Sequence, residues 1–235
     1  MRIFYLLTVI IFASCSNTFT NPDNTIQDAE KKFSESYPDL KIDTIAKIND
    51  SFFEILIGDQ IFYISSDLKY LIAGNVIELA TKKNLTQERI KDHRLSFIKN
   101  IDPKNTIIYK PDNTKHVLNI FTDISCPYCK KLHNEIDSLI ENNIEVRYVL
   151  FSRNGSEDDA HKEMISIWCS DNKKLSLDKA FNGEEIPEKN CENPLGSNLQ
   201  LAYDLRVNGT PMIFKENGDI IPGYVPYRQI LESFN

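Results

Sequence analysis

Cys126-Pro127-Tyr128-Cys129 lies between an apolar stretch, His116 to Phe121, and a segment with the apolar spacing of a helix. The stretch before it has the β-branched and aromatic composition of a strand. The apolar face of the predicted helix is formed by Leu132, Ile136, Leu139 and Ile140. A strand that leads through a C-x-x-C pair into a helix predicts an α/β domain with thiol–disulfide chemistry at the helix N-terminus.

The two cysteines of this pair are expected to have different roles. A thiol at a helix N-terminus faces free amide groups and the positive end of the helix dipole, and both favour the thiolate. Cys126 is therefore the predicted nucleophile, and Cys129, one turn later, is the predicted resolving thiol. Pro127 suits the first turn because no N–H is needed there. A zinc half-site would require another closely spaced cysteine pair, which the chain lacks, so neither a metal nor a cofactor is expected.

A second motif, Thr210-Pro211, stands immediately before the predicted strand Met212 to Phe214. A proline at this place can hold a cis turn that faces the C-x-x-C pair. It would leave the preceding backbone free to pair with a bound substrate strand beside the sulfur. The alternative is an ordinary proline at the start of a strand.

The N-terminus has the pattern of an export signal over residues 1–15. Arg2 precedes an apolar run, Ile3 to Ala13, that is shorter than the roughly 20 residues needed to span a bilayer. Phe12-Ala13-Ser14-Cys15 resembles a bacterial lipobox, which makes Cys15 a candidate lipid anchor, and a soluble exported protein is the alternative. We expect the bacterial periplasm, where disulfides are the default state of the other cysteines.

Composition limits the classes of partner and the number of domains. The 235 residues are 41% hydrophobic and 10% aromatic, enough for two small cores or one larger one, and we expect two domains. A net charge of -7 and a pI near 5.2 offer no broad basic surface, so nucleic acid is not an expected partner.

Residues 24–80 have the pattern of a small α+β domain. Asn24 and Gln27 have the form of a capping box for a short helix. Strand-like segments follow at Lys41 to Ile48, Phe52 to Ile57, Ile61 to Ser65 and Tyr70 to Leu79, with Gly58-Asp59 as a hairpin turn. The region contains neither cysteine nor histidine, so a structural or pairing role is expected, with dimerisation across an exposed sheet edge. A linker helix is predicted from Thr86 to Ile101, and a second domain from about Thr106.

Three motifs together resemble one family, the periplasmic disulfide isomerases of the DsbC and DsbG type. They are Phe121 to Cys129, Gly209-Thr210-Pro211 and Pro222-Gly223-Tyr224. The resemblance extends over the chain after the signal and is strongest from about Lys115 onward. The Pro-Tyr dipeptide between the cysteines is closer to DsbG than to the Gly-Tyr of DsbC.

The resemblance implies an α+β N-terminal dimerisation domain over 24–80, a linker helix over 81–105, and an α/β thioredoxin-like catalytic domain over 106–235. A helical insertion would occupy about 152–205 and contain a structural disulfide between Cys169 and Cys191. The implied assembly is a V-shaped homodimer with both active sites facing an apolar cleft. A lipid on Cys15 would be a departure from the best-known members and would attach the protein to a membrane.

The resemblance also implies an activity and its partners. The protein would isomerise or reduce wrong disulfides in misfolded or misoxidised exported proteins, and an inner-membrane thiol reductant of the DsbD type would keep it reduced. Thr210 and Pro211 would align the client backbone, with Pro127 and Tyr128 beside the sulfur. Competing functions are a dithiol oxidase, a sulfenic-acid reductase and a chaperone-type binding protein.

Three further side chains are candidate partners of the thiols. His133 is expected at the surface rather than in proton transfer, because it lies about two turns after Cys126. Asp123 and Arg147 are candidate tuners of the thiols, with simple solvation or ion pairing as the alternative. For His161 and Trp168, ordinary packing is expected.

Overall fold

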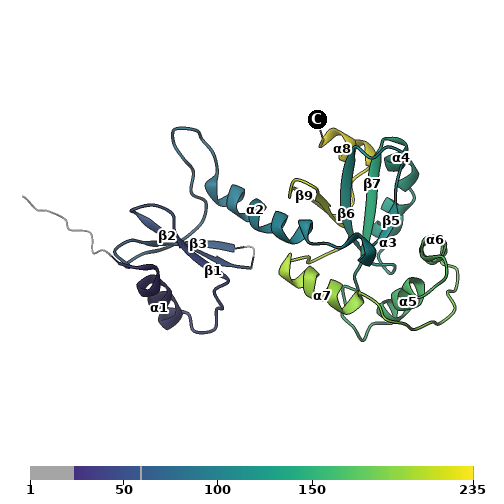
Figure 1. Ribbon diagram of the computed structural model, residues 1–235, viewed down its shortest axis with the longest axis horizontal. Helices are drawn as coiled ribbons and strands as arrows, with labels where there is room; N and C mark the ends of the chain where they lie inside the picture. Colours follow the sequence, from purple (N-terminus) through teal and green to yellow (C-terminus); the bar gives the residue numbers. More distant parts are fainter. Residues whose placement is uncertain (1–23, 59, 235) are drawn as a thin grey trace, which may run out of the picture.

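The computed structural model describes residues 24–58 and 60–234. The expected signal over 1–15, with Cys15, lies outside this part of the chain. Figure 1 shows a small N-terminal unit, a larger C-terminal unit, and α2 (Leu85–Lys99) running from one to the other. No helix within the described ranges is long and apolar enough to cross a membrane.

The N-terminal unit is a four-stranded antiparallel sheet with one helix packed on it. Its elements are α1 (Ile26–Ser36), β1 (Thr44–Lys47), β2 (Phe52–Ile57), β3 (Gln60–Ser65) and β4 (Leu71–Ala73). Ala29 and Phe33 are the buried residues of α1, and they pack against Phe53, Ile55 and Ile64 of the sheet. These side chains form one buried core of the unit.

Two details of this unit differ from the sequence-based prediction. The capping box lies one residue later, because Thr25 is the N-cap of α1 and its side chain and that of Asp28 bond reciprocally to each other's backbone N–H. The fourth strand is only Leu71–Ala73. The chain turns away after it, and Ile77 makes only an isolated bridge with Asn84.

The predicted hairpin between β2 and β3 is present. Ile57 pairs with Gln60, which leaves two residues for the turn. Gly58 has a φ of 62°, in the region that favours glycine, and its place in the turn suits that conformation.

The C-terminal unit contains a five-stranded sheet in the order β5-β7-β6-β8-β9. It is preceded by α2 (Leu85–Lys99) and the short helix η1 (Pro103–Asn105). Its elements are β5 (Ile107–Tyr109), β6 (His116–Thr122), α3 (Pro127–His133), α4 (Ile136–Glu141), β7 (Ile144–Leu150), α5 (Asp159–Trp168), α6 (Lys173–Asn182), α7 (Leu195–Asp204), β8 (Met212–Lys215), β9 (Ile220–Pro222) and α8 (Tyr227–Glu232). The helices α5, α6 and α7 form an insertion between β7 and β8.

Helices pack on both faces of this sheet. The larger core joins strands β6 and β7 to α3, α4, α5 and α6. A second core joins Phe121, Val149 and Phe214 to Ile98 of α2 and Ala202 of α7. β6 and β7 are parallel, with Thr122 opposite Leu150, so both strands end at the same edge of the sheet. The C-x-x-C pair begins at that edge.

The single helix expected after Cys126 is two helices. α3 ends at His133 and α4 begins at Ile136, with Asn134 and Glu135 between them. The carboxylate of Glu135 accepts hydrogen bonds from Tyr224 and from the backbone of Tyr227, so this break is used to hold the segment that leads into α8.

Candidate active site

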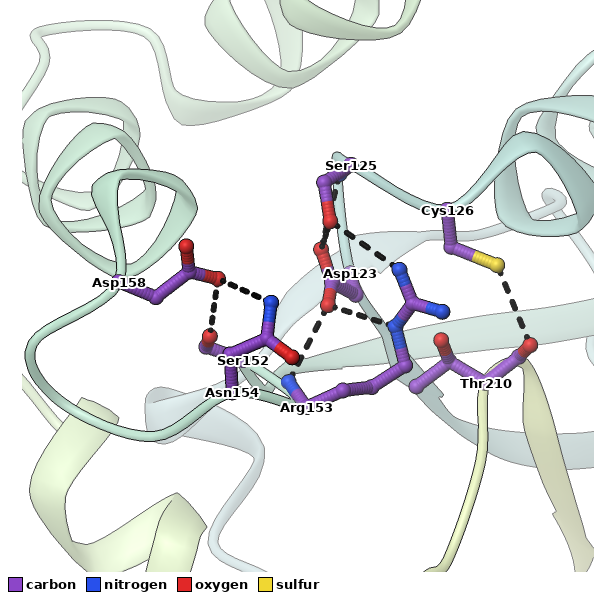
Figure 2. A network of polar contacts seen from close by, with 8 residues as sticks. All are labelled: Asp123, Ser125, Cys126, Ser152, Arg153, Asn154, Asp158 and Thr210. Atoms are coloured by element: carbon purple, nitrogen blue, oxygen red, sulfur yellow. Dashed lines mark hydrogen bonds and ion pairs between the residues drawn. The ribbon is translucent and has the colours of Figure 1, made fainter.

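Cys126 is the N-cap residue of α3, and Cys129 lies in its first turn. Cys126 Sγ donates a hydrogen bond to the backbone oxygen of Thr210 at 3.2 Å, as Figure 2 shows. Both cysteines are unpaired and buried, whereas Tyr128 between them is 60% exposed. The site therefore offers a client an exposed aromatic ring beside a shielded sulfur.

The two thiols differ in acidity, as their positions predict. Burial by itself would raise the pKa of Cys126, but the Thr210 side chain and the N–H groups of Cys129 and Tyr128 favour its thiolate, and the net pKa is lowered. Burial raises the pKa of Cys129 to about 11. One sulfur is thus prepared to attack as a thiolate, and the other is held as a thiol.

An ion pair with a buried carboxylate lies beside the sulfurs. Asp123 is fully buried, and its carboxylate accepts hydrogen bonds from Ser125 and from the backbone and guanidinium of Arg153, with 2.9 Å between Arg153 Nε and Asp123 Oδ2 (Figure 2). Arg153 also donates to the Ser125 hydroxyl and interacts electrostatically with Cys126 and Cys129. A fixed positive charge therefore favours the thiolate.

The Thr210-Pro211 peptide bond is cis, and Thr210 faces Cys126 as the motif predicted. The backbone oxygen of Pro211 accepts a hydrogen bond from Gly223 N at 2.9 Å. Gly223 belongs to the Pro222-Gly223-Tyr224 motif, so two motifs of the sequence meet behind the nucleophile.

Glu135 connects this loop to the helix that carries the cysteines. Its carboxylate accepts hydrogen bonds from Tyr224 Oη at 2.5 Å and from Tyr227 N at 2.7 Å. Lys131 Nζ lies 4.6 Å from the centre of the Tyr224 ring. Tyr224 is therefore held at its ring and its hydroxyl by one short stretch of chain around the end of α3.

Cys169 and Cys191 are joined by a disulfide with a sequence separation of 22. Cys169 follows α5 directly, and Cys191 lies in the segment between α6 and α7. This bond closes a loop within the helical insertion, and neither of its cysteines belongs to the C-x-x-C pair. Trp168 and His161 are buried in the same insertion.

The prediction that His133 lies at the surface is wrong. His133 is buried between β7 and α6, with its ring nitrogens 3.3 Å from Tyr148 Oη and 3.1 Å from Asp178 Oδ1, and it stacks on Phe181. It lies one turn after Cys129, on the inward face of α3. The insertion supplies Asp178 and Phe181, which helical spacing alone does not reveal.

Of the two candidate tuners, only Asp123 lies beside the sulfurs. Arg147 Nε lies 2.6 Å from Glu145 Oε1 on the same strand. Sequence reasoning missed Arg153, the cation that does neighbour the thiols. It follows the end of β7, and the parallel pairing of β6 with β7 brings it to Asp123. No group of three or more metal-ligating side chains occurs in the described ranges.

Comparison with known proteins places this geometry in a family. A family model described as "Thioredoxin-like domain" matches residues 103–235, and one described as "Disulfide bond isomerase protein N-terminal domain" matches residues 20–87. The chain belongs to the DsbC family of thiol:disulfide interchange proteins. The expected fold class, a DsbC-type N-terminal domain followed by a thioredoxin-like fold, is confirmed.

The similarity to individual relatives extends over most of the chain. The thiol:disulfide interchange protein DsbC of Escherichia coli is 30% identical over 97% of this chain and 93% of its own length. DsbC of Dickeya dadantii is 34% identical over 75% of this chain and 73% of its own length. A crystal structure of a disulfide interchange protein from Neisseria gonorrhoeae is similar with a TM-score of 0.51 and 26% identity, over 56% of this chain and 94% of that one.

Proposed function

We propose that this DsbC-family chain isomerises or reduces wrong disulfides in exported proteins through Cys126 and Cys129. The Cys126 thiolate attacks a client disulfide and forms a mixed disulfide. A client thiol then displaces Cys126 and leaves a new pairing, or Cys129 attacks and releases the client reduced. The observation that carries this proposal is the position of Cys126 at the N-cap of α3, one turn before Cys129, with its sulfur against the backbone oxygen that precedes cis Pro211.

The surroundings of Cys126 support a role in binding extended client backbone. The Thr210 backbone oxygen lies beside the sulfur, and Pro211 contributes no backbone N–H that would need a partner of its own. Tyr128 is exposed next to the nucleophile, and Pro127 fixes the first turn of α3. We assign client binding to these four residues and a structural role to the disulfide between Cys169 and Cys191.

The proposal includes the assembly and the compartment. The DsbC-type N-terminal domain supports a homodimer, and an inner-membrane thiol reductant of the DsbD type would keep the pair reduced. We propose the bacterial periplasm as the compartment, with a lipid on Cys15 as a candidate anchor. We also propose that the chain divides into an N-terminal dimerisation domain over 24–80, a linker helix over 81–105 and a catalytic domain over 106–235.

Recovery of ribonuclease activity in glutathione buffer tests the function. The assay starts in parallel from scrambled disulfides and from the reduced chain, with Cys126→Ser and Cys129→Ser as variants. We expect faster recovery from the scrambled start, lost in Cys126→Ser. Acceleration from the reduced start alone would identify an oxidase, and help that survives in Cys126→Ser would identify a chaperone.

A further inference from the structure

Thr122, the last residue of β6, has a buried hydroxyl with no hydrogen-bond partner among the described residues. Its backbone oxygen is satisfied, because Phe151 N donates to it at 2.9 Å. A buried hydroxyl without a partner destabilises the fold, and valine would fill the same space without that penalty. The hydroxyl is therefore expected to find its partner in another state of the protein.

Thr122 lies on the same face of β6 as Ile120, and Ile120 packs in one core cluster with Cys129. The Cys129 sulfur is therefore the group that can become this partner. The side chains of Thr122 and Thr210 and the backbone of Asp123 oppose the rise that burial causes in the Cys129 pKa. The Thr210 hydroxyl is likewise buried and without a partner within the described ranges. A protonated thiol is a weak acceptor, so these hydroxyls gain little from it, whereas a thiolate is a strong one.

Charged and titratable groups also face Cys129. Cys126 caps the same helix, Tyr148 approaches from β7, and Arg153, which follows β7, interacts with Asp123 and with both sulfurs. Burial keeps Tyr148 neutral, with its pKa above the ordinary value. A fixed hydroxyl at the end of β6 adds stabilisation to a sulfur that burial otherwise keeps protonated.

We propose that Thr122 is a catalytic residue of the resolving step, in which its hydroxyl donates a hydrogen bond to the Cys129 thiolate as that sulfur attacks the mixed disulfide. This inference rests on the proposed interchange function. Cys129 first loses its proton to solvent. Its electron pair then forms the bond to Cys126 Sγ, the bond between Cys126 and the client sulfur breaks, and the client leaves as a thiolate that takes a proton from water. Two electrons pass from the cysteine pair to the client disulfide.

This role separates the two outcomes of the mixed disulfide. Isomerisation by a client thiol bypasses Cys129 and does not need the Thr122 hydroxyl. Reduction requires the Cys129 thiolate and does need it. The Thr122 hydroxyl therefore speeds release of a reduced client relative to isomerisation.

The test uses the reduced mature protein and a peptide with a single internal disulfide, under single-turnover conditions with acid quenching and mass spectrometry. Thr122→Val removes the hydroxyl at nearly constant volume, and Thr122→Ser keeps it. Thr106→Val is the matched control, because its buried hydroxyl bonds to Pro103 O, away from the sulfurs. Thr122→Ala repeats the hydroxyl loss if the valine variant does not fold.

We expect Thr122→Val to form the mixed disulfide at the wild-type rate and to resolve it about tenfold more slowly, the effect of losing one hydrogen bond to a charged acceptor. Thr122→Ser should restore the rate, and the thermal midpoint of Thr122→Val should be unchanged or higher. Equal resolution rates in Thr122→Val and wild type would overturn the inference, as would slow resolution in Thr122→Ser, which would assign the effect to packing. If the wild-type protein forms no mixed disulfide, the proposed interchange function is wrong, and the inference about Thr122 fails with it.

Discussion

Asp123 and Arg153 form an ion pair in which the carboxyl group is fully buried and the guanidinium lies beside the two active-site sulfurs. The pair joins the segment after β6 to the segment after β7. It therefore links the stability of the catalytic domain to the acidity of its nucleophile.

Arg153→Met should weaken both properties. It leaves a buried carboxylate without its cation, and we expect a loss of about 2 kcal/mol in the free energy of unfolding, less than for a fully buried pair because Arg153 is partly exposed. Removal of the charge should also raise the pKa of Cys126, measured from the pH dependence of its alkylation in the Cys129→Ser background. Arg147→Met, which breaks the pair with Glu145, is the control and should leave the Cys126 pKa unchanged.

The stability effect should depend on pH in a defined direction. Burial would raise the pKa of Asp123, but hydrogen bonds from Ser125 and Arg153 outweigh it and lower the pKa in the folded protein. The stabilisation is thus complete above the unfolded pKa of about 3.9 and is lost as pH falls through the folded value. Urea unfolding of wild type and Arg153→Met should converge in acid, and a constant difference would contradict this account.

Tyr224→Phe should impair client binding more than chemistry. The change removes the hydroxyl that bonds to Glu135 and loosens the segment whose Gly223 N holds Pro211 O. We expect about a threefold rise in KM for a disulfide peptide, with a smaller change in kcat. Tyr227→Phe is the matched control, since the described contact of that hydroxyl is with Arg228. An identical effect in both variants would show that aromatic hydroxyls in this region matter only for packing.

Loss of the disulfide in the insertion should reduce stability without stopping the reaction. Replacing both Cys169 and Cys191 with alanine removes a bond between residues 22 positions apart. The chain-entropy model gives a loss of about 3 kcal/mol in the free energy of unfolding. Denaturant unfolding measures the loss, and the alkylation rate of Cys126 serves as the internal control. A stable double variant with a slow nucleophile would assign these cysteines to the reaction instead.

His133 should make the folded state less stable as the solution becomes mildly acidic. Burial lowers the pKa of this imidazole against the opposing effect of Asp178, so below about pH 6.5 the unfolded chain binds the additional proton. The free energy of unfolding should therefore fall between pH 7 and pH 5, and His133→Phe should reduce that slope. The remaining slope belongs partly to His161, whose pKa burial also lowers. An unchanged slope in His133→Phe would show that the unfolding transition does not report on this imidazole.

The parts of the site that the sequence predicted are those set by local pattern. Cys126 at the helix N-terminus follows from a strand, a short loop and a helix in direct succession, and Thr210-Pro211 follows from its place before β8. Both lie where these patterns put them.

The parts that were missed or misplaced depend on contacts between distant segments. Arg153 reaches Asp123 because β6 and β7 are parallel neighbours. His133 is buried because the insertion returns to cover it with Phe181. The break in the active-site helix coincides with the bonds of Glu135 to the segment before α8. No local spacing in the sequence encodes these three contacts.

The contacts of α2, the helix predicted to be a linker, determine where the chain can be truncated. Lys91 pairs with Asp219, Arg94 donates to Gly218 O, and a side chain at Gly218 would press on the backbone of α2 at 3.0 Å. The end of α2 also supplies Ile98 to the core that contains Phe121 and Phe214. A catalytic fragment that starts at Thr106 would lose one wall of its own core, so a fragment meant to fold alone should begin near Asn84, ahead of the N-cap of α2.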